Sequence, residues 1–399
     1  MRQIHLTLLL LLVALTSQAQ QRQLLATVTV SNPTTEQRHE VVSIDTTGMR
    51  LPADFIVQDA FGIERPWQLT HDGLLLIDVR VRPTGQARYT VSSGRHKPMK
   101  AYVGGRYYPE RADDISFEND RTGFRIYGPT TQRRGEQAFG HDVWVKATPE
   151  LMLDSLYSFE FSLHKQIYAL RDRGGTDDRL LADSLEVLTS YHLDHGFGMD
   201  CYNVGPTLAC GTPTLMDGDT MLMPWCYETF EILDNGPLRF TLRLDFGRMH
   251  GATEHRLLVL DKGSNFCRCT VWYDGMEQPR RLAAGVAIRQ SAPNGVVTGP
   301  DYVQYADPTG DVQRHNCQIY VATVFPNGVD ETRFMPFPAP VKGNVGHAVG
   351  IVNNYTGKPY TYYFGAAWSE YDVRSQAEWQ LRIDALRHAL RQPLTVTID

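Results

Sequence analysis

The stretch Asp234-Asn-Gly-Pro-Leu-Arg-Phe-Thr-Leu-Arg-Leu244 contains a turn followed by a strict alternation of apolar and polar residues. Asn-Gly-Pro is typical of a turn, and the alternation after it predicts a β-strand that is buried on one face. Successive side chains of a strand point to opposite sides. The core face would carry Leu238, Phe240, Leu242 and Leu244, and the polar face Arg239, Thr241 and Arg243.

Strand-like runs continue on both sides of this stretch, at 24–30, 55–57, 74–81, 87–91, 227–232, 255–260, 267–273, 286–289, 317–324, 346–352 and 361–364. The short early runs, separated by Gly and Pro, predict a small β-sandwich over residues 22–99. Helical spacing predicts a helical pair within 149–189 and a last helix that begins with a capping box at Ser375 and Glu378. We therefore expect a mainly β protein, with a large β domain over residues 100–399 and a few peripheral helices.

Residues 1–19 have the features of a secretory signal peptide. Arg2 precedes an apolar run from Leu6 to Leu15, and Ser17 and Ala19 supply small residues before a cleavage point. The run is shorter than the roughly 20 residues needed to cross a bilayer, and no later stretch is long and apolar enough. We expect a protein without a membrane span that is periplasmic or secreted.

The net charge and the cysteine positions limit the binding partners, disulfides and metal sites that the sequence predicts. The net charge is -6, from 39 basic and 45 acidic residues, and no basic cluster is present, which argues against a nucleic-acid partner. Cys201 and Cys210 could close a short loop, but six cysteines in 399 residues fit buried thiols better. No spacing predicts a metal site or a cofactor. The sequence leaves the oligomeric state open.

The stretch from Ser190 to Gly211 is rich in side chains that could take part in catalysis or binding. It places two His, two Asp, two Tyr, two Cys and four Gly within 22 residues. The polar side chains could act as acids, bases or ligands, and the glycines let the backbone approach a substrate closely. We expect this stretch to roof a cleft whose floor is the polar face of 238–244 and the strand before Tyr127.

Seven strings carry a family resemblance: Asn32-Pro33, Arg125-Ile-Tyr-Gly-Pro129, Gly140-His-Asp-Val-Trp-Val-Lys146, Ser190-Tyr-His-Leu-Asp-His-Gly196, Val204-Gly-Pro-Thr-Leu208, Ile232-Leu-Asp-Asn-Gly-Pro-Leu-Arg239 and Tyr362-Tyr-Phe-Gly365. Together they resemble the bacterial domain of unknown function 4861 over nearly the whole chain. The Asn-Gly-Pro-Leu-Arg strand is similar to one in galactose-mutarotase-like β-supersandwiches, a fold shared by aldose epimerases, polysaccharide lyases and sugar-binding parts of glycosidases. The resemblance implies such a fold for residues 100–399 and a place in a polysaccharide-utilisation system for pectin-like, uronate-bearing glycans.

Cleavage of a uronate glycoside by β-elimination requires a base, a cation or donor for the enolate and an acid for the leaving oxygen. The candidates for proton transfer are His192 and His195, with Tyr127 or Tyr202 as partner. Arg125 or Arg239 would bind the substrate carboxylate. Further candidate substrate-binding residues are His141, Lys146, Asp194, Asp200, Glu228 and Trp368.

Other readings of the same residues stay open. A glycoside hydrolase would use two carboxylates from the set Asp142, Asp194, Asp200 and Glu228. A non-catalytic sugar-binding accessory protein and a sugar epimerase are the further alternatives. Each candidate also has a structural reading, in which the histidines hold a loop, the arginines form ion pairs and the aromatic rings fill the core.

Overall fold

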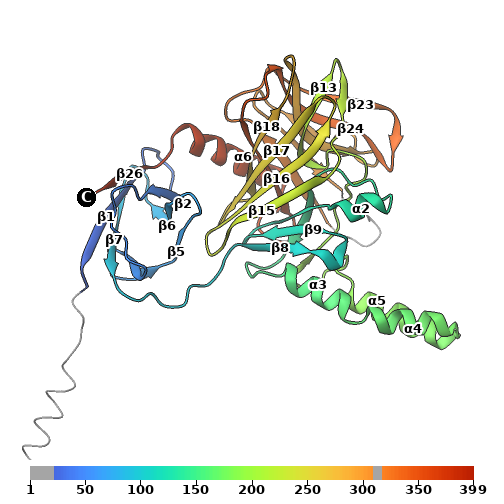
Figure 1. The fold of residues 1–399 in the computed structure, drawn as a ribbon, viewed down its shortest axis with the longest axis horizontal. Helices are drawn as coiled ribbons and strands as arrows, with labels where there is room; N and C mark the ends of the chain where they lie inside the picture. The colour runs from blue at the N-terminus through green and yellow to red at the C-terminus, as the bar shows by residue number, and fades with distance from the viewer. Residues whose placement is uncertain (1–21, 309–316) are drawn as a thin grey trace, which may run out of the picture.

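The computed structural model describes residues 22–308 and 317–399. The predicted signal peptide, residues 1–19, lies outside the described residues. The described chain is mainly β, with five sheets and a few helices, as the alternating runs predicted. Figure 1 shows a small N-terminal domain in blue beside a much larger β domain. None of the described helices combines the length and hydropathy needed to span a bilayer.

The N-terminal domain is a sandwich of two antiparallel sheets. One sheet is built from β26 (Thr395–Ile398), β1 (Leu24–Ser31), β7 (Gln86–Ser93), β3 (Phe55–Asp59) and β4 (Glu64–Arg65), in that order. The other consists of β2 (Arg38–Asp45), β6 (Leu74–Val81) and β5 (Trp67–Leu69). Alternating apolar residues of both sheets form one core between them, as in Val28, Val42, Ile77 and Val91.

The last strand of the chain corrects the predicted domain division, which placed everything after residue 99 in the large domain. Strand β26 pairs antiparallel with β1, and Ile398 lies opposite Val28. Leu394 and Val396 pack against the N-terminal core. An unpaired edge strand and an alternating Thr-Val-Thr-Ile sequence satisfy each other's backbone groups here. Local patterning predicts a strand but does not name its partner.

The large domain contains two antiparallel sheets that pack face to face. The eight-stranded sheet consists of β15 (Tyr227–Asn235), β16 (Arg239–Met249), β17 (Ala252–Asp261), β18 (Phe266–Asp274), β25 (Tyr360–Trp368), β22 (Ile319–Val324), β21 (Tyr302–Asp307) and β20 (Val296–Thr298). The five-stranded sheet consists of β14 (Thr220–Leu222), β13 (Cys210–Asp217), β19 (Arg280–Arg289), β24 (Asn344–Tyr355) and β23 (Glu331–Val341).

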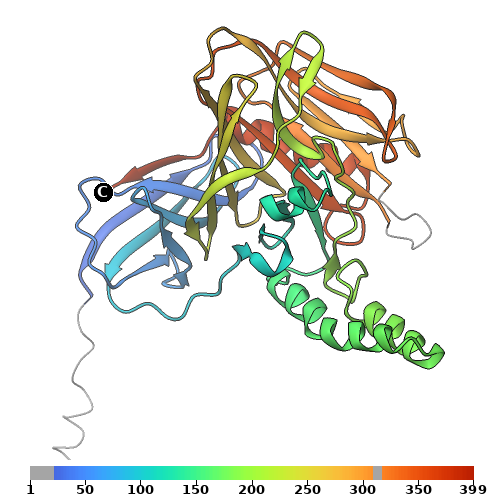
Figure 2. The same cartoon turned by 45° about the vertical axis from the view of Figure 1, so that its right-hand side comes forward.

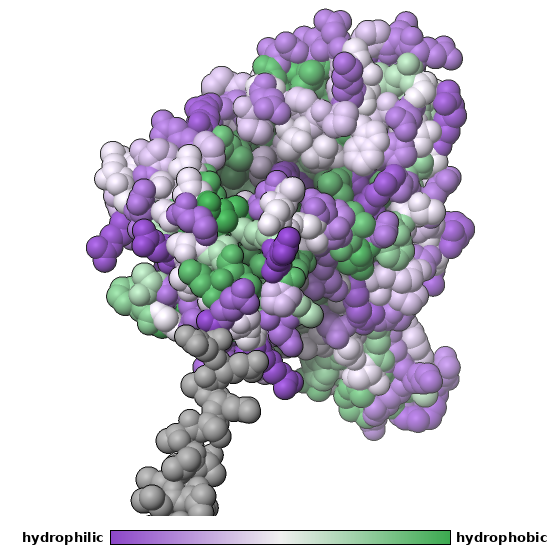
Figure 3. All heavy atoms as spheres, turned by 60° about the vertical axis from the view of Figure 1, so that its left-hand side comes forward, coloured by the Kyte–Doolittle hydropathy of each residue, from purple (hydrophilic) through white to green (hydrophobic). Residues whose placement is uncertain are grey.

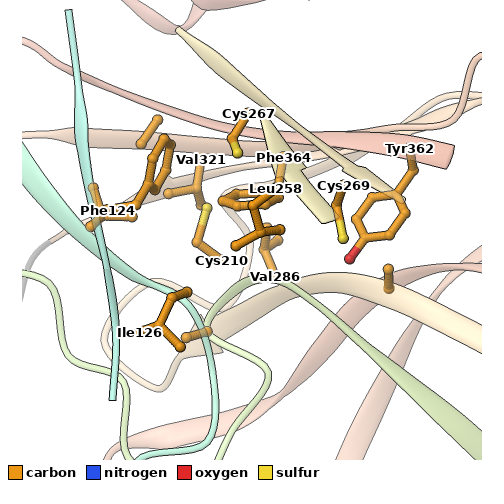
Figure 4. Close-up of a cluster of buried hydrophobic side chains, with 14 of the residues drawn as sticks. Phe124, Ile126, Cys210, Leu258, Cys267, Cys269, Val286, Val321, Tyr362 and Phe364 are labelled. Carbon is orange, nitrogen blue, oxygen red and sulfur yellow. The ribbon is translucent and has the colours of Figure 1, made fainter. Parts of the chain in front are cut away.

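The core between these sheets bears out the alternation of 238–244. The even-numbered apolar residues of β16 are buried in the main cluster, while Arg243 is exposed. Figure 4 shows side chains of several strands meeting there, among them Leu258, Val286 and Phe364. Cys210, Cys267 and Cys269 lie in this core as thiols, which agrees with the expectation of buried free cysteines.

A smaller sheet carries the candidate site. Its strands are β12 (Gly198–Met199), β11 (Asp142–Lys146), β10 (Gly123–Ile126), β9 (Asp114–Glu118) and β8 (Gly104–Tyr108). One face, with Phe117, Phe124 and Val143, packs on the main core. The other face carries the polar alternates Ser116, Arg125 and Asp142, which lie in one row across three strands.

Helices cover that polar face and extend away from it. The short helices are η1 (Pro109–Arg111) and α2 (Pro129–Arg133), and the longer ones are α3 (Leu153–Ser162), α4 (His164–Arg173), α5 (Thr176–Thr189) and α6 (Gln376–Arg391). The predicted helical pair is therefore three helices, because Leu163 separates α3 from α4. Figures 1 and 2 both show α4 and α5 projecting from the body as an arm.

Polar contacts join the two domains. The Gln68 side chain accepts from the backbone N–H groups of Leu238 and Arg239, both at 2.8 Å, and donates to the Arg239 carbonyl. Lys262 Nζ donates to Asp78 Oδ2 at 2.8 Å.

The face that Figure 3 presents is hydrophilic around its margin and gathers apolar side chains near its centre.

Candidate active site

The guanidinium of Arg125 lies at the centre of a buried polar cluster. The side chain is 2% exposed, and its Nη2 donates to Tyr127 Oη and to Asp200 Oδ2, both at 2.7 Å, and to Asp142 Oδ2. Strand alternation causes this placement, since Phe124 and Ile126 on either side face the main core. The sequence thus brings one cation and several acids together beneath helix α3.

Two acids of this cluster, Asp142 and Asp114, resist ionisation. Burial raises the pKa of Asp142 to about 6, although the Arg125 charge opposes that shift. Burial likewise raises the pKa of Asp114 to about 7, and Asp114 Oδ2 lies 3.9 Å from Arg125 Nε. The Arg125 and Arg111 charges offset the desolvation of Asp114 only in part, so the pKa values of Asp142 and Asp114 both stay above the usual range of an aspartate.

Arg125 is not available to bind a substrate carboxylate, which was one of its expected roles. Its Nη2 is engaged by two protein carboxylates, and the side chain is sealed from solvent. A half-buried cation beside the cluster, Arg111, is better placed. Its Nε donates to Tyr191 Oη at 2.9 Å, and no carboxylate is paired with its guanidinium among the described residues.

The backbone around Arg111 holds an uncommon conformation. Ala112 and Asp113 follow it with φ of 55° and 64°, in the left-handed region that costs a non-glycine residue about 1 kcal/mol. Gly128 packs directly on this turn, because a Cβ there would lie 1.9 Å from the Asp113 carbonyl oxygen. Sequence reasoning missed Arg111 and Asp114. Arg111 ends helix η1 and Asp114 begins β9 beside β10, and no local motif reveals that these elements meet the 190–211 stretch.

His192 lies at the solvent edge of the cluster. Its Nδ1 is 2.9 Å from the Asp200 carbonyl oxygen and 3.6 Å from Asp200 Oδ2, and its side chain is 52% exposed. Both neighbours of Nδ1 are acceptors, so Nδ1 carries the proton and donates. Nε2 is then left with its lone pair and has no partner within the described part of the chain. This is the geometry of an oriented general base.

The loop that presents His192 is fixed by its own side chains. Asp194 Oδ1 accepts from the N–H groups of Gly196 and Gly198 at 2.8 and 2.9 Å, and His195 Nε2 donates to the Ser190 carbonyl at 3.0 Å. Gly198 has φ of 116°, and a Cβ there would meet the Val145 carbonyl oxygen at 2.1 Å. The pairing of β12 with β11 then places Asp200 beside Asp142. Asp194 and His195 thus hold the shape of the loop. His192 and Asp200, which meet at His192 Nδ1, are called here the His192–Asp200 dyad.

Arg239 lies outside this cluster, contrary to the expectation of a cleft floored by both arginines. Its guanidinium pairs with Asp261, with Nε–Oδ1 at 2.6 Å, and reaches Ser43 of the N-terminal domain. The polar face of β16 is therefore turned toward the domain contact at Arg239 and toward solvent at Arg243. Only the first part of the 190–211 stretch, with Tyr191, His192 and Asp200, lies at the Arg125 cluster, whereas Tyr202, Val204 and Cys210 are buried in the main core.

The remaining expected site residues lie in other surroundings. The His141 ring is buried against Phe364, its Nε2 accepts from Arg256 Nη1 at 3.0 Å, and burial holds its pKa well below the usual range. Lys146 forms a buried ion pair with Glu118. Tyr202 is buried under the Arg289 guanidinium, Trp368 is buried in β25, and Glu228 is exposed on β15.

A comparison with known families identifies the chain. The model of the domain of unknown function 4861 matches residues 30–396. The chain belongs to the DUF4861 family. A similar protein is the uncharacterized protein P7 of Formosa agariphila. The two are 24% identical over 386 residues, which cover 92% of this chain and 86% of that protein.

Solved structures resemble this DUF4861 member distantly. An α-mannosidase from Enterococcus faecalis gives a TM-score of 0.46 at 9% identity, covering 94% of this chain and 46% of that one. A family 36 α-galactosidase from Geobacillus stearothermophilus gives 0.33 at 10% identity, covering 67% and 41%. The chain thus spans less than half of either structure.

Proposed function

We propose that this chain is an exported carbohydrate-active enzyme that cleaves uronate-containing oligosaccharides by β-elimination, with His192 as the base. The observation that carries the proposal is the His192–Asp200 dyad, in which the Asp200 backbone carbonyl orients an exposed imidazole whose Nε2 has no partner among the described residues. In a uronate the proton beside the carboxylate is the acidic one. A base at the cluster edge is placed for a sugar that approaches from solvent.

The surrounding groups supply the other two requirements of this reaction. The Arg111 guanidinium would bind the substrate carboxylate and stabilise the enolate that forms from it. Tyr127 Oη donates to Asp142 Oδ2 at 2.8 Å, and burial raises the pKa of Tyr127, so the hydroxyl stays protonated as a candidate acid. The Asp200 carboxylate would stabilise the imidazolium that proton transfer creates.

The same geometry disfavours hydrolysis through the carboxylates of this cluster. Asp142 and Asp200 both bind Arg125 Nη2, and neither side chain is more than 3% exposed. Hydrolases need their two carboxyl groups about 5 Å or more apart, one on each side of the glycosidic bond. A sugar cannot lie between two acids that share one nitrogen.

Two histidine variants on one loop test the proposal. The parent, His192→Ala and His195→Ala would be incubated with pectic oligosaccharides, and product read by absorbance of the new C=C bond and by reducing ends. General-base catalysis contributes roughly 10² to 10⁴-fold, so His192→Ala should lose that much kcat. His195→Ala should retain most activity, and both should melt within a few degrees of the parent.

Each contrary result has a defined meaning. Full activity of His192→Ala would remove the base assignment. Reducing ends that form without C=C absorbance would show hydrolysis in place of β-elimination. Reducing ends that form together with C=C absorbance would exclude hydrolysis. Binding by the parent without any cleavage would favour the accessory sugar-binding function, and interconversion of free sugars would favour an epimerase.

A further inference from the structure

A large groove lies between the two domains, away from the His192 loop. Its volume is about 1020 Å³, and its walls are β2 of the N-terminal domain, the outer face of β17, β18 and β25, and helix α6. Figure 1 shows α6 passing between the N-terminal domain and the large domain. Pockets for drug-sized ligands span about 300 to 1,000 Å³, so this groove accommodates a ligand of several sugar units.

The groove is basic in a chain that is acidic overall. Six basic residues line it, namely Arg38, Arg121, Lys262, Arg268, Arg382 and Arg391. Three acidic residues line it, namely Glu36, Glu40 and Asp261. The whole chain has a net charge of -6. A local excess of cations against that background attracts an anionic ligand.

Ion pairs neutralise some of these cations but not all. Arg38 pairs with Glu40, Lys262 with Asp78 and Arg391 with Asp301. Arg121 and Arg382 share one carboxylate, that of Asp372, at 2.5 and 3.8 Å. Burial lowers the pKa of Arg382, and the neighbouring Arg121 charge lowers it further. Two guanidinium groups on one acid leave a positive charge uncompensated.

Arg268 adds a second uncompensated charge on the adjacent wall. Within residues 22–308 and 317–399 its guanidinium has neither a hydrogen bond nor an ion pair, although the side chain is half-buried. It lies directly opposite Tyr363 across the β18–β25 pairing. Both residues line the groove. An arginine beside an aromatic ring combines a donor pair for an anionic group with an apolar surface for a sugar ring.

We propose that this groove binds an acidic oligosaccharide, with Arg268, Arg121 and Arg382 on its carboxylate or sulfate groups and Tyr363 against a sugar ring. The sugar part of this ligand rests on the proposed function, whereas the anionic part follows from the groove itself. The two sites lie on different sheets. The groove would hold a long chain of the polysaccharide while the His192 loop acts on one bond.

Binding by the full chain tests the groove independently of catalysis. The background is His192→Ala, so that no probe is cleaved, and calorimetry would compare oligogalacturonate, a sulfated oligosaccharide, a neutral galactan oligosaccharide and a DNA oligonucleotide. The matched pair is Arg268→Gln and Arg179→Gln, since Arg179 is an exposed arginine of α5 without a carboxylate partner in the described chain. Melting temperatures check that each variant is folded.

We expect oligogalacturonate or the sulfated sugar to bind, and the stronger of the two identifies the anionic group. Arg268→Gln should weaken that binding about tenfold, Arg268→Gln with Arg382→Gln more, and Arg179→Gln not at all. Added salt should weaken binding as well. Equal binding by Arg268→Gln and the parent background overturns the proposal, as does equal binding of the neutral sugar or of DNA. These outcomes are readable even if the parent cleaves no substrate.

Discussion

The imidazole of His347 is buried in β24 and must stay uncharged. Its Nε2 accepts from the Leu208 backbone N–H at 2.9 Å, and Nδ1 has no partner in the described chain. Burial lowers its pKa to about 3. An unfolded histidine titrates near 6.5, so the stability that this group contributes is complete above pH 6.5 and is lost as the pH falls toward 3.

We therefore predict that His347→Gln flattens the acid limb of the stability profile. One extra proton bound by the unfolded state costs about 1.4 kcal/mol per pH unit. Between pH 7.5 and pH 5 the parent should lose about 2 kcal/mol more unfolding free energy than the variant, measured by urea denaturation at each pH. His141 titrates in both proteins and cancels in the difference. A gap between the two proteins that stays constant with pH would contradict the prediction.

Individual site residues differ in how far the sequence could reveal them. His192, Asp200 and Arg125 came from composition and alternation, because titratable groups next to glycines stand out locally. Arg111 and Asp114 could not be found in that way, since they join the cluster through helix η1 and the start of β9, which pairs with β10. Arg239 was expected beside Arg125 because both face away from apolar neighbours. Alternation gives the side of a strand, but it does not say which domain covers that side.

Among the elements, strands and the capped last helix follow from local pattern. The Ser375 side chain accepts from the Glu378 N–H at 3.2 Å, as the capping box predicts, and Trp379 and Ile383 form its buried stripe. Partners of strands do not follow from local pattern. In the eight-stranded sheet β25 lies beside β18, although six strands separate them in the sequence. Of these, β20, β21 and β22 lie farther along the same sheet, and β19, β23 and β24 belong to the five-stranded sheet.

The short strand β12 gives a prediction at this scale. Gly198→Ala would place a Cβ 2.1 Å from the Val145 carbonyl oxygen, so the β11–β12 pairing must open and Asp200 must move. Gly196→Ala is the matched control, since Gly196 also has positive φ, 92°, but meets nothing within 4 Å. Gly196→Ala should cost about 1 kcal/mol from its backbone conformation alone.

We expect Gly198→Ala to cost at least twice that free energy and also to lower turnover by displacing the His192–Asp200 dyad. Urea denaturation measures the first effect and the C=C assay the second. Equal stability of the two alanine variants would show that the loop relaxes without disturbing β11.

At the scale of the whole molecule, the pairing of β26 with β1 ties the ends of the described chain into one sheet. Removal of residues 394–399 would expose the β1 edge and uncover part of the N-terminal core. We predict that this truncation makes the N-terminal domain more sensitive to limited proteolysis and lowers its unfolding midpoint. Thr397→Ser, which retains the backbone pairing, is the control. An unchanged digestion pattern after truncation would mean that β26 stabilises little.

The same pairing imposes an order of events on a newly made chain. Strand β1 is synthesised before the large domain, but its outer edge stays without β26 until the large domain has been made. An unpaired edge invites pairing with other chains. The sheet of the small domain is therefore started before the large domain is made and completed only after it, and during that interval the β1 edge is open to association.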